Sequence, residues 1–174
     1  LVAVNPYKPI DYCSSEALSA LTEVEPESMA PHIFRLSRAA YAAMIGTATA
    51  QSILISGESG AGKTETTKLC MASLAEMSSS TGAATEAALD SGYLLESFGN
   101  ARTVHNHNSS RFGKWVAIHF DDEQKINTCM IKSFLLEKSR VVVQGPGERN
   151  YHIFYQLLAA AAATPDAPAL ADVT

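Results

Sequence analysis

The chain has 174 residues, of which 47% are hydrophobic and 18% charged, close to the average of folded soluble proteins. Its formal net charge of -5 argues against a nucleic-acid-binding protein, because such proteins concentrate Lys and Arg to neutralise phosphates. No apolar run approaches the roughly 20 residues that cross a bilayer, and no signal-peptide pattern opens the chain. We expect one ordinary domain or a piece of a larger one.

The cysteines and histidines do not form a recognisable site. Cys13, Cys70 and Cys129 are far apart and have neither metal-ligand spacing nor a disulfide framework, which favours a reducing, cytoplasmic setting. His105 and His107 are close together, but no neighbouring Cys or carboxylate completes a metal site. A metal-binding histidine pair is therefore not expected.

The first half of the chain predicts two helices around a strand. Apolar residues at helical spacing from Met29 to Met44 predict a helix with Pro31 in its first turn and Gly46 at its end. The apolar run Ser52–Ser56 is typical of a strand buried on both faces. A glycine-rich turn then leads to a helix from about Thr64 to Met77. The residues of this second helix expected to be buried are Cys70, Ser73, Leu74 and Met77.

The second half predicts mainly strands. Ser78–Ala88 contains almost no bulky residues, so we expect a surface loop. Alternating apolar residues in Lys114–Asp121 and a similar run in Ile126–Phe134 predict a hairpin. Further elements are expected as a short helix near Tyr93–Phe98, a strand at Val141–Val143 and a helix over Tyr151–Ala163. Strand, glycine-rich turn, helix and further strands together indicate an α/β sheet domain.

The glycine-rich turn fits a phosphate-binding loop. It reads Gly57-Glu58-Ser59-Gly60-Ala61-Gly62-Lys63-Thr64, two glycines five residues apart followed by Lys and Thr. Glycines let several backbone N–H groups approach phosphate oxygens at once, because no Cβ intervenes. The following helix would direct its unpaired N–H groups and positive dipole end at the anion. Lys63 can reach the β- and γ-phosphates, and the Thr64 hydroxyl can bind Mg²⁺.

A second polar segment, Asn106-His107-Asn108-Ser109-Ser110-Arg111-Phe112-Gly113-Lys114, allows two interpretations. Two hydroxyls and an arginine can close over a γ-phosphate and Mg²⁺, as nucleotide-sensing switch loops do. The alternative is a hydrophilic surface loop capped by serine. Spacing alone favours neither.

Together the two segments resemble the phosphate loop and the first switch loop of the myosin motor head. Kinesins have a similar Asn and Ser-Ser-Arg core but continue with Ser-His, where this chain has Phe112-Gly113-Lys114. The resemblance extends over nearly the whole chain, in the family's order. Its other blocks are Asn5-Pro6-Tyr7-Lys8, Pro31–Phe34, Gln51–Gly57, Phe98–Ala101, Leu135–Val142 and Gly147–Leu158. It implies a partial motor domain over residues 1–174 with a phosphate-loop NTPase sheet flanked by helices.

The resemblance also implies roles for individual residues. Nucleotide contacts would be made by Asn5, Pro6, Tyr7, Gly57, Glu58, Ser59, Gly60, Ala61, Gly62, Lys63, Thr64, Glu65, Asn106 and Asn108, with Tyr12 as a further adenine-side candidate. Catalytic roles fall to Lys63, Ser109 and Arg111, and Mg²⁺ would be bound by Thr64 and Ser110. Arg111 would pair with a Glu on the second switch loop. The loop at 78–88 would influence ADP release, and the hairpin at 114–134 would relay nucleotide state.

Two positions depart from the family pattern. Thr66 replaces a usual Asn, so an adenine-side contact is expected to be weaker. His107 replaces a usual Asp or Asn and is expected to face outward.

The implied activity is that of an actin-based motor that binds MgATP and hydrolyses it in the full-length protein. Its partners would be actin filaments and, on the neck, light chains or calmodulin; no nucleic acid and no transmembrane segment are expected. Its place would be the actin cytoskeleton of the cytoplasm. The second switch loop and the actin-binding region are absent from this sequence, so we expect the isolated chain to be unstable and inactive. The alternatives are a kinase or GTPase, which Asn106–Lys114 argues against, and a nucleotide-binding but non-hydrolysing myosin-like regulatory or scaffold protein.

Overall fold

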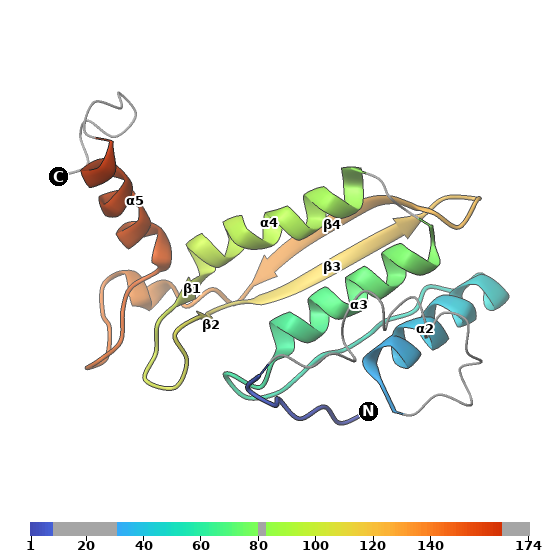
Figure 1. The fold of residues 1–174 in the computed structure, drawn as a ribbon, viewed down its shortest axis with the longest axis horizontal. Helices are drawn as coiled ribbons and strands as arrows, with labels where there is room; N and C mark the ends of the chain where they lie inside the picture. Colours follow the sequence, from blue (N-terminus) through green and yellow to red (C-terminus); the bar gives the residue numbers. More distant parts are fainter. Residues whose placement is uncertain (9–30, 80–82, 165–174) are drawn as a thin grey trace. The chain divides into compact units, whose positions relative to one another are not determined.

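A computed structural model describes residues 1–8, 31–79 and 83–164. The chain divides into two compact units, residues 1–87 with 118–129 and residues 88–117 with 130–174. Helices and strands are mixed along the chain (Figure 1), as expected for an α/β protein.

The first unit is built on two helices that pack against each other, α2 (Ile33–Thr47) and α3 (Lys63–Met77). Their buried residues include Phe34 and Ser37 on α2 and Cys70, Met71 and Ser73 on α3. Serines at the buried positions of both helices are small, which allows close approach of the helices. Burial raises the pKa of the Cys70 thiol, and a hydrogen bond with Ser37 partly opposes this.

Helix α3 lies within one residue of its predicted bounds, whereas helix α2 begins later than predicted. Cys70 and Ser73 are buried as predicted, whereas Leu74 and Met77 are only half-buried and Met71 was missed. Pro31 does not enter α2, because His32 caps the helix by accepting a 3.1 Å hydrogen bond at Nδ1 from the Phe34 N–H. Met29 lies outside the described residues.

The predicted hairpin is confirmed as β3 (Gly113–Phe120) paired with β4 (Ile126–Phe134) (Figure 1). The Asp121 N–H donates to the Lys125 carbonyl oxygen at 2.9 Å and closes the turn. The turn also contacts α2 in the same unit. Tyr41 donates its hydroxyl to the Gln124 carbonyl at 2.9 Å and packs its ring 5.4 Å from that of Phe120.

The second unit contains the end of α4 (Ala83–Gly99) and a short antiparallel ladder of β1 (Asn100–Ala101) and β2 (Ser109–Ser110). A 3₁₀ turn, η2 (Lys138–Val141), and the helix α5 (His152–Ala163) follow. α5 matches the predicted helix over Tyr151–Ala163 to within one residue.

Three predicted elements are wrong. Ser52–Ser56 forms no strand, because no described segment pairs with it, and Leu54 is 92% exposed. The loop predicted at Ser78–Ala88 gives way to helix α4 from Ala83, because this part is rich in alanine, the best helix former. The helix predicted near Tyr93–Phe98 is present, as the last part of the longer helix α4.

Val141–Val143 is the third wrong prediction. It is not a strand but the end of η2 and a following turn, in which the Val142 and Val143 N–H groups donate to the Ser139 carbonyl. The β propensity of three valines is overridden there by the tertiary contacts of the neighbouring Arg140, which is buried.

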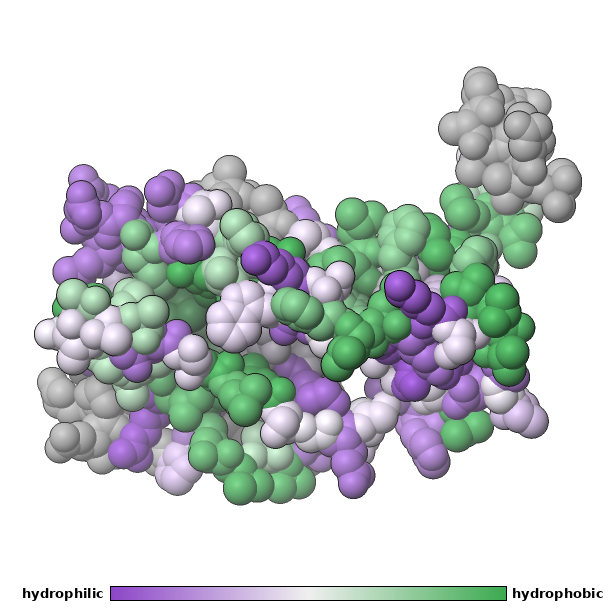
Figure 2. Space-filling view, turned by 180° about the vertical axis from the view of Figure 1, so that it is seen from behind, coloured by the Kyte–Doolittle hydropathy of each residue, from purple (hydrophilic) through white to green (hydrophobic). Residues whose placement is uncertain are grey.

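Large apolar side chains reach the surface in both units. On the side drawn in Figure 2, hydrophobic residues, in green, are exposed among hydrophilic ones. Among the most exposed are Leu54 in the first unit and Leu135 and Val142 in the second. Such residues are ones that a larger protein would be able to cover.

Candidate functional site

The glycine-rich turn leads directly into helix α3. Gly62 caps the helix at φ 96°, and Gly60 has φ 81°, conformations that residues with a Cβ adopt at a cost. The Lys63 ammonium reaches back across the turn and donates to the carbonyl oxygens of Gly57 at 2.7 Å and Glu58 at 2.9 Å. The segment is therefore a closed loop with a cation on its carbonyl side and a helix N-terminus at its end, where anions are stabilised.

The start of the chain is attached to this loop. Asn5 donates from Nδ2 to the Gly60 carbonyl oxygen at 2.8 Å, and its Oδ1 accepts from the Tyr7 N–H at 2.9 Å. A Cβ on Gly62 would lie 3.9 Å from the Asn5 side chain, an ordinary van der Waals contact. Tyr7 itself is largely exposed and has a positive φ of 52°. The structure thus brings Asn5 to Gly60, while Tyr12 lies outside the described residues.

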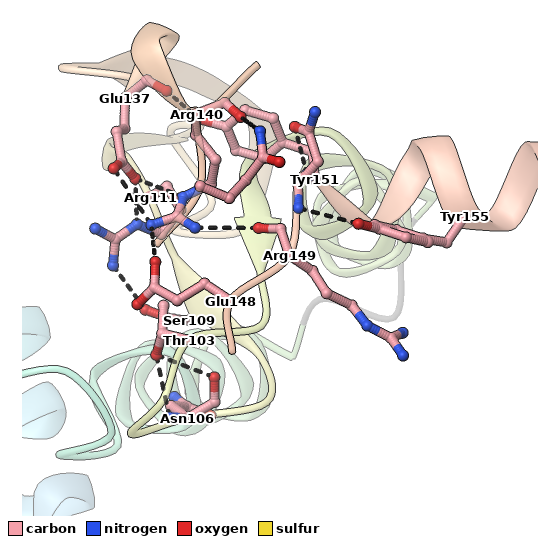
Figure 3. Close-up of polar contacts among 12 residues, drawn as sticks. Thr103, Asn106, Ser109, Arg111, Glu137, Arg140, Glu148, Arg149, Tyr151 and Tyr155 are labelled. Carbon is pink, nitrogen blue, oxygen red and sulfur yellow. Dashed lines mark hydrogen bonds and ion pairs between the residues drawn. The ribbon is translucent and has the colours of Figure 1, made fainter. Parts of the chain in front are cut away.

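In the second unit, the ladder of β1 and β2 forms the base of the Asn106–Lys114 segment. Between the two strands, Thr103 and Asn106 form a tight turn. The Thr103 N–H donates to the Asn106 carbonyl at 2.9 Å, and the Asn106 N–H donates to Thr103 Oγ1 at 3.1 Å (Figure 3). The Asn106 side chain accepts from the Asn108 N–H at 2.9 Å. His107 is exposed, as expected.

The Asn108 side chain faces protein groups. Its Oδ1 accepts from Asn100 Nδ2 at 2.9 Å and lies 3.0 Å from His152 Nε2, and its Nδ2 donates to Glu96 at 3.0 Å. Desolvation lowers the pKa of His152, which favours a neutral ring that can donate to Asn108. Three side chains of the same unit therefore hold Asn108 in place.

Arg111 is held by both side-chain and backbone hydrogen bonds. Its Nε donates to Glu137 Oε2 at 2.6 Å, and Nη1 donates to Ser109 Oγ at 3.1 Å (Figure 3). Two backbone bonds support it: the Arg111 N–H donates to Gly99, and the Glu137 N–H donates to the Arg111 carbonyl at 3.0 Å. The resemblance predicted that Arg111 pairs with a glutamate on a second switch loop. In this structure the carboxylate paired with Arg111 is that of Glu137.

Glu137 also binds a second arginine. Arg140 Nε donates to the same Oε2 at 2.8 Å, and Arg140 is further paired with Glu148 at 2.9 Å. With only 4% of its surface exposed, Arg140 is a buried charge, which is stable because it is paired on both sides. The Arg140 hydrogen bond is the main reason that the pKa of Glu137 is lowered; burial opposes it, and Arg111 lowers it further.

Sequence reasoning did not identify Glu137, Arg140, Glu148 or Tyr151. The available signal was the Glu137–Arg140 spacing of three residues, which suits an ion pair on a helical turn. Charged residues at that spacing are common on solvated surfaces, so the spacing alone does not reveal burial. The structure therefore brings together Asn5, Gly60 and Lys63 in the first unit and Ser109, Arg111 and Glu137 in the second.

In the part of the chain that the structure describes, no cluster of three or more His, Cys, Asp or Glu residues is arranged to hold a metal ion. Among the described helices, none has the length and apolar character of a membrane span.

Comparison with known proteins gives one family. The family model described as myosin head (motor domain) matches residues 1–170. Similar proteins include Myosin-I heavy chain of Dictyostelium discoideum, 48% identical over 161 residues, which are 92% of this chain and 7% of that protein. Myosin-1 of Arabidopsis thaliana is 49% identical over 161 residues, which cover 92% of this chain and 14% of the relative. Myosin-2 heavy chain, non muscle, of Acanthamoeba castellanii is 46% identical over 163 residues, covering 92% and 11%.

The chain thus spans only a small part of the length of these relatives. Both the matched range and the identities confirm the resemblance found in the sequence. This chain belongs to the myosin head (motor domain) family.

Proposed function

We propose that this chain is the nucleotide-binding part of an actin-based motor. It binds MgATP through residues 57–64 and, in the full-length protein, hydrolyses it to drive movement on actin filaments. The observation that carries the proposal is Lys63, which is the first residue of α3 and holds its ammonium 2.7 Å from the Gly57 carbonyl, over the glycine turn. Membership of the myosin head family supports the motor.

The loop residues fit a triphosphate. Gly60 and Gly62 have positive φ and no Cβ, so backbone N–H groups can approach phosphate oxygens closely. The α3 N-terminus adds the positive end of a 15-residue helix. A bound triphosphate would compete with the carbonyls of Gly57 and Glu58 for the Lys63 ammonium, because a phosphate is the stronger acceptor.

Hydroxyl oxygens suit Mg²⁺, and Thr64 and Ser110 supply them in this proposal. Bound Mg²⁺ would neutralise charge on the β- and γ-phosphates. Ser109 would contact the γ-phosphate and the attacking water, and Arg111 would stabilise the closed segment. The nucleotide contacts assigned to Pro6, Glu58, Ser59, Ala61, Glu65, Asn106 and Asn108 belong to the same proposal.

The proposed setting is the actin cytoskeleton of the cytoplasm. Actin filaments would be bound by head regions outside this sequence, and light chains or calmodulin would bind a neck. Membership of the myosin head family supports actin as the partner.

The test is nucleotide turnover by the full-length protein with and without actin filaments. We expect MgATP binding, slow basal phosphate release and acceleration of that release by actin. A protein that binds MgATP but releases no phosphate under either condition would instead be a non-hydrolysing regulatory or scaffold relative. Failure to bind MgATP at all would contradict the proposal.

A further inference from the structure

The guanidinium of Arg111 is held from several sides within the second unit. Glu137 Oε2 accepts from Nε at 2.6 Å and Ser109 Oγ accepts from Nη1 at 3.1 Å (Figure 3). The backbones of Arg111 and Glu137 are joined directly by a 3.0 Å hydrogen bond. Arginine has several rotatable bonds, so these contacts together select one rotamer from many.

The carboxylate that holds Arg111 is itself fixed. Glu137 receives two hydrogen bonds from Arg140, at 2.8 Å and 3.3 Å, and its carbonyl oxygen accepts from the Tyr151 hydroxyl at 2.7 Å. Tyr151 and Arg140 are both buried. Arg140 is anchored in turn by Glu148 at 2.9 Å and by the Arg149 carbonyl at 3.0 Å. The orientation of Arg111 therefore depends on a buried, rigid support.

The support leaves one edge of the guanidinium available. Within the described residues, Arg111 Nη2 makes no hydrogen bond, whereas Nε and Nη1 are engaged (Figure 3). Nη2 can therefore donate to an anion from outside the cluster without breaking the Glu137 contact.

Ser109 connects this support to the proposed chemistry. It is 2% exposed, and its Oγ is the acceptor for Arg111 Nη1. Fixing the guanidinium therefore fixes one hydrogen bond of the Ser109 hydroxyl. A small displacement of a positioned catalytic group can cost about 100-fold in rate.

We propose that Glu137 is a positioning residue for ATP cleavage: by holding Arg111 it sets the Ser109 hydroxyl and presents Arg111 Nη2 to an incoming anion. This inference rests on the proposed function. Glu137 touches neither the nucleotide nor the water in this account and acts only through Arg111.

The test uses the full-length protein, with MgATP affinity and the single-turnover cleavage rate measured separately. In Glu137→Gln we expect cleavage to slow by roughly 10- to 100-fold, while MgATP affinity changes by less than about threefold. Because Glu137 acts through Arg111, the double variant Arg111→Ala with Glu137→Gln should be no slower than Arg111→Ala alone. Additive losses in that cycle would overturn the inference.

Glu148→Gln is the comparison variant. It removes a carboxylate charge from Arg140 but leaves the direct Arg111–Glu137 contact, so it should lower thermal stability and slow cleavage clearly less than Glu137→Gln does. If Glu137→Gln does not fold, Glu137→Asp replaces it; the shorter side chain keeps the charge but withdraws from Arg111, and cleavage should again slow. A purely structural role predicts that both Glu137 variants cleave at the unmodified rate per folded molecule.

Failure of the two proposals can be told apart. If the unmodified protein does not cleave ATP, the proposed function fails, and this inference fails with it. If the unmodified protein cleaves ATP and the Glu137 variants do so equally fast, only the role of Glu137 is refuted.

Discussion

Asn5 Nδ2 donates a 2.8 Å hydrogen bond to the carbonyl oxygen of Gly60, although 55 residues separate them in the chain. This contact attaches the N-terminal segment to the centre of the glycine turn. It fixes a carbonyl in the loop whose backbone we propose binds phosphate, so the segment contributes to the loop's shape.

Removing this contact should weaken nucleotide binding. In Asn5→Ala we expect a loss of about 0.5–1.5 kcal/mol, or roughly 2- to 10-fold in MgATP affinity, because one hydrogen bond that orders the loop is gone. The measurement is a fluorescent-nucleotide titration. Val4→Ala, at a neighbouring and highly exposed position, is the control and should bind as the unmodified protein does. Equal affinities of the two variants would refute this role of Asn5.

Gly62 should tolerate a side chain poorly. Alanine at φ 96° is strained, so Gly62→Ala is expected to lower the free energy of unfolding by about 1–2 kcal/mol. Gly46 offers a matched control in helix α2, where an added Cβ meets no atom within 4 Å. Gly46→Ala should stabilise by up to about 1 kcal/mol, because alanine is the better helix former. Denaturant unfolding measures the free energy of unfolding of both variants. A Gly46→Ala variant less stable than the unmodified protein would show that Gly46 is not a valid control for Gly62.

Gly99 lies under the Phe112 ring, which an added Cβ would overlap. Gly99→Ala should therefore destabilise the protein by about 1–3 kcal/mol through overpacking. Replacing the ring relieves the overlap, so the double variant with Phe112→Leu should be more stable than the sum of the two single effects predicts. Thermal unfolding of the four proteins measures this coupling, and strict additivity would show that the two residues do not interact.

The Glu137 cluster should make stability sensitive to acid. Hydrogen bonds from Arg140 are the main cause of the lowered pKa of Glu137, from its ordinary value of 4.5. The ionised carboxylate is thus favoured in the folded state, and this stability is present above pH 4.5 and lost as the pH falls through the lower folded pKa. The difference in unfolding free energy between the unmodified protein and Glu137→Gln should shrink over that range. A difference that stays constant down to pH 3 would contradict the assignment.

The sequence predicted the elements whose local pattern and tertiary environment agree. Helix α3 and the hairpin of β3 and β4 have clear periodicity and were located to within about one residue. Ser52–Ser56 was mispredicted because strand formation needs a partner that local pattern does not contain. Val141–Val143 was mispredicted because its backbone follows the buried Arg140, a constraint set by distant residues.

In the candidate site too, the features with a local sequence pattern were predicted and those set by distant residues were not. The glycine turn and Lys63 could be found from the motif, since each position has a local chemical reason. Glu137 could not, because its importance comes from Arg111, 26 residues away in sequence. The roles assigned to Ser109, Ser110 and Asn106 remain predictions that nucleotide experiments must test.

The central claim is that the glycine turn with Lys63 binds the phosphates of MgATP, and affinity for MgATP in Lys63→Ala tests it most directly. Lys68→Ala is the matched control, because Lys68 lies on the same helix and pairs with Glu65 at 3.0 Å. We predict that Lys63→Ala weakens binding by at least about tenfold, the effect of losing a charged hydrogen bond, and that Lys68→Ala changes it by less than about twofold. Equal affinities of Lys63→Ala and the unmodified protein would contradict the account.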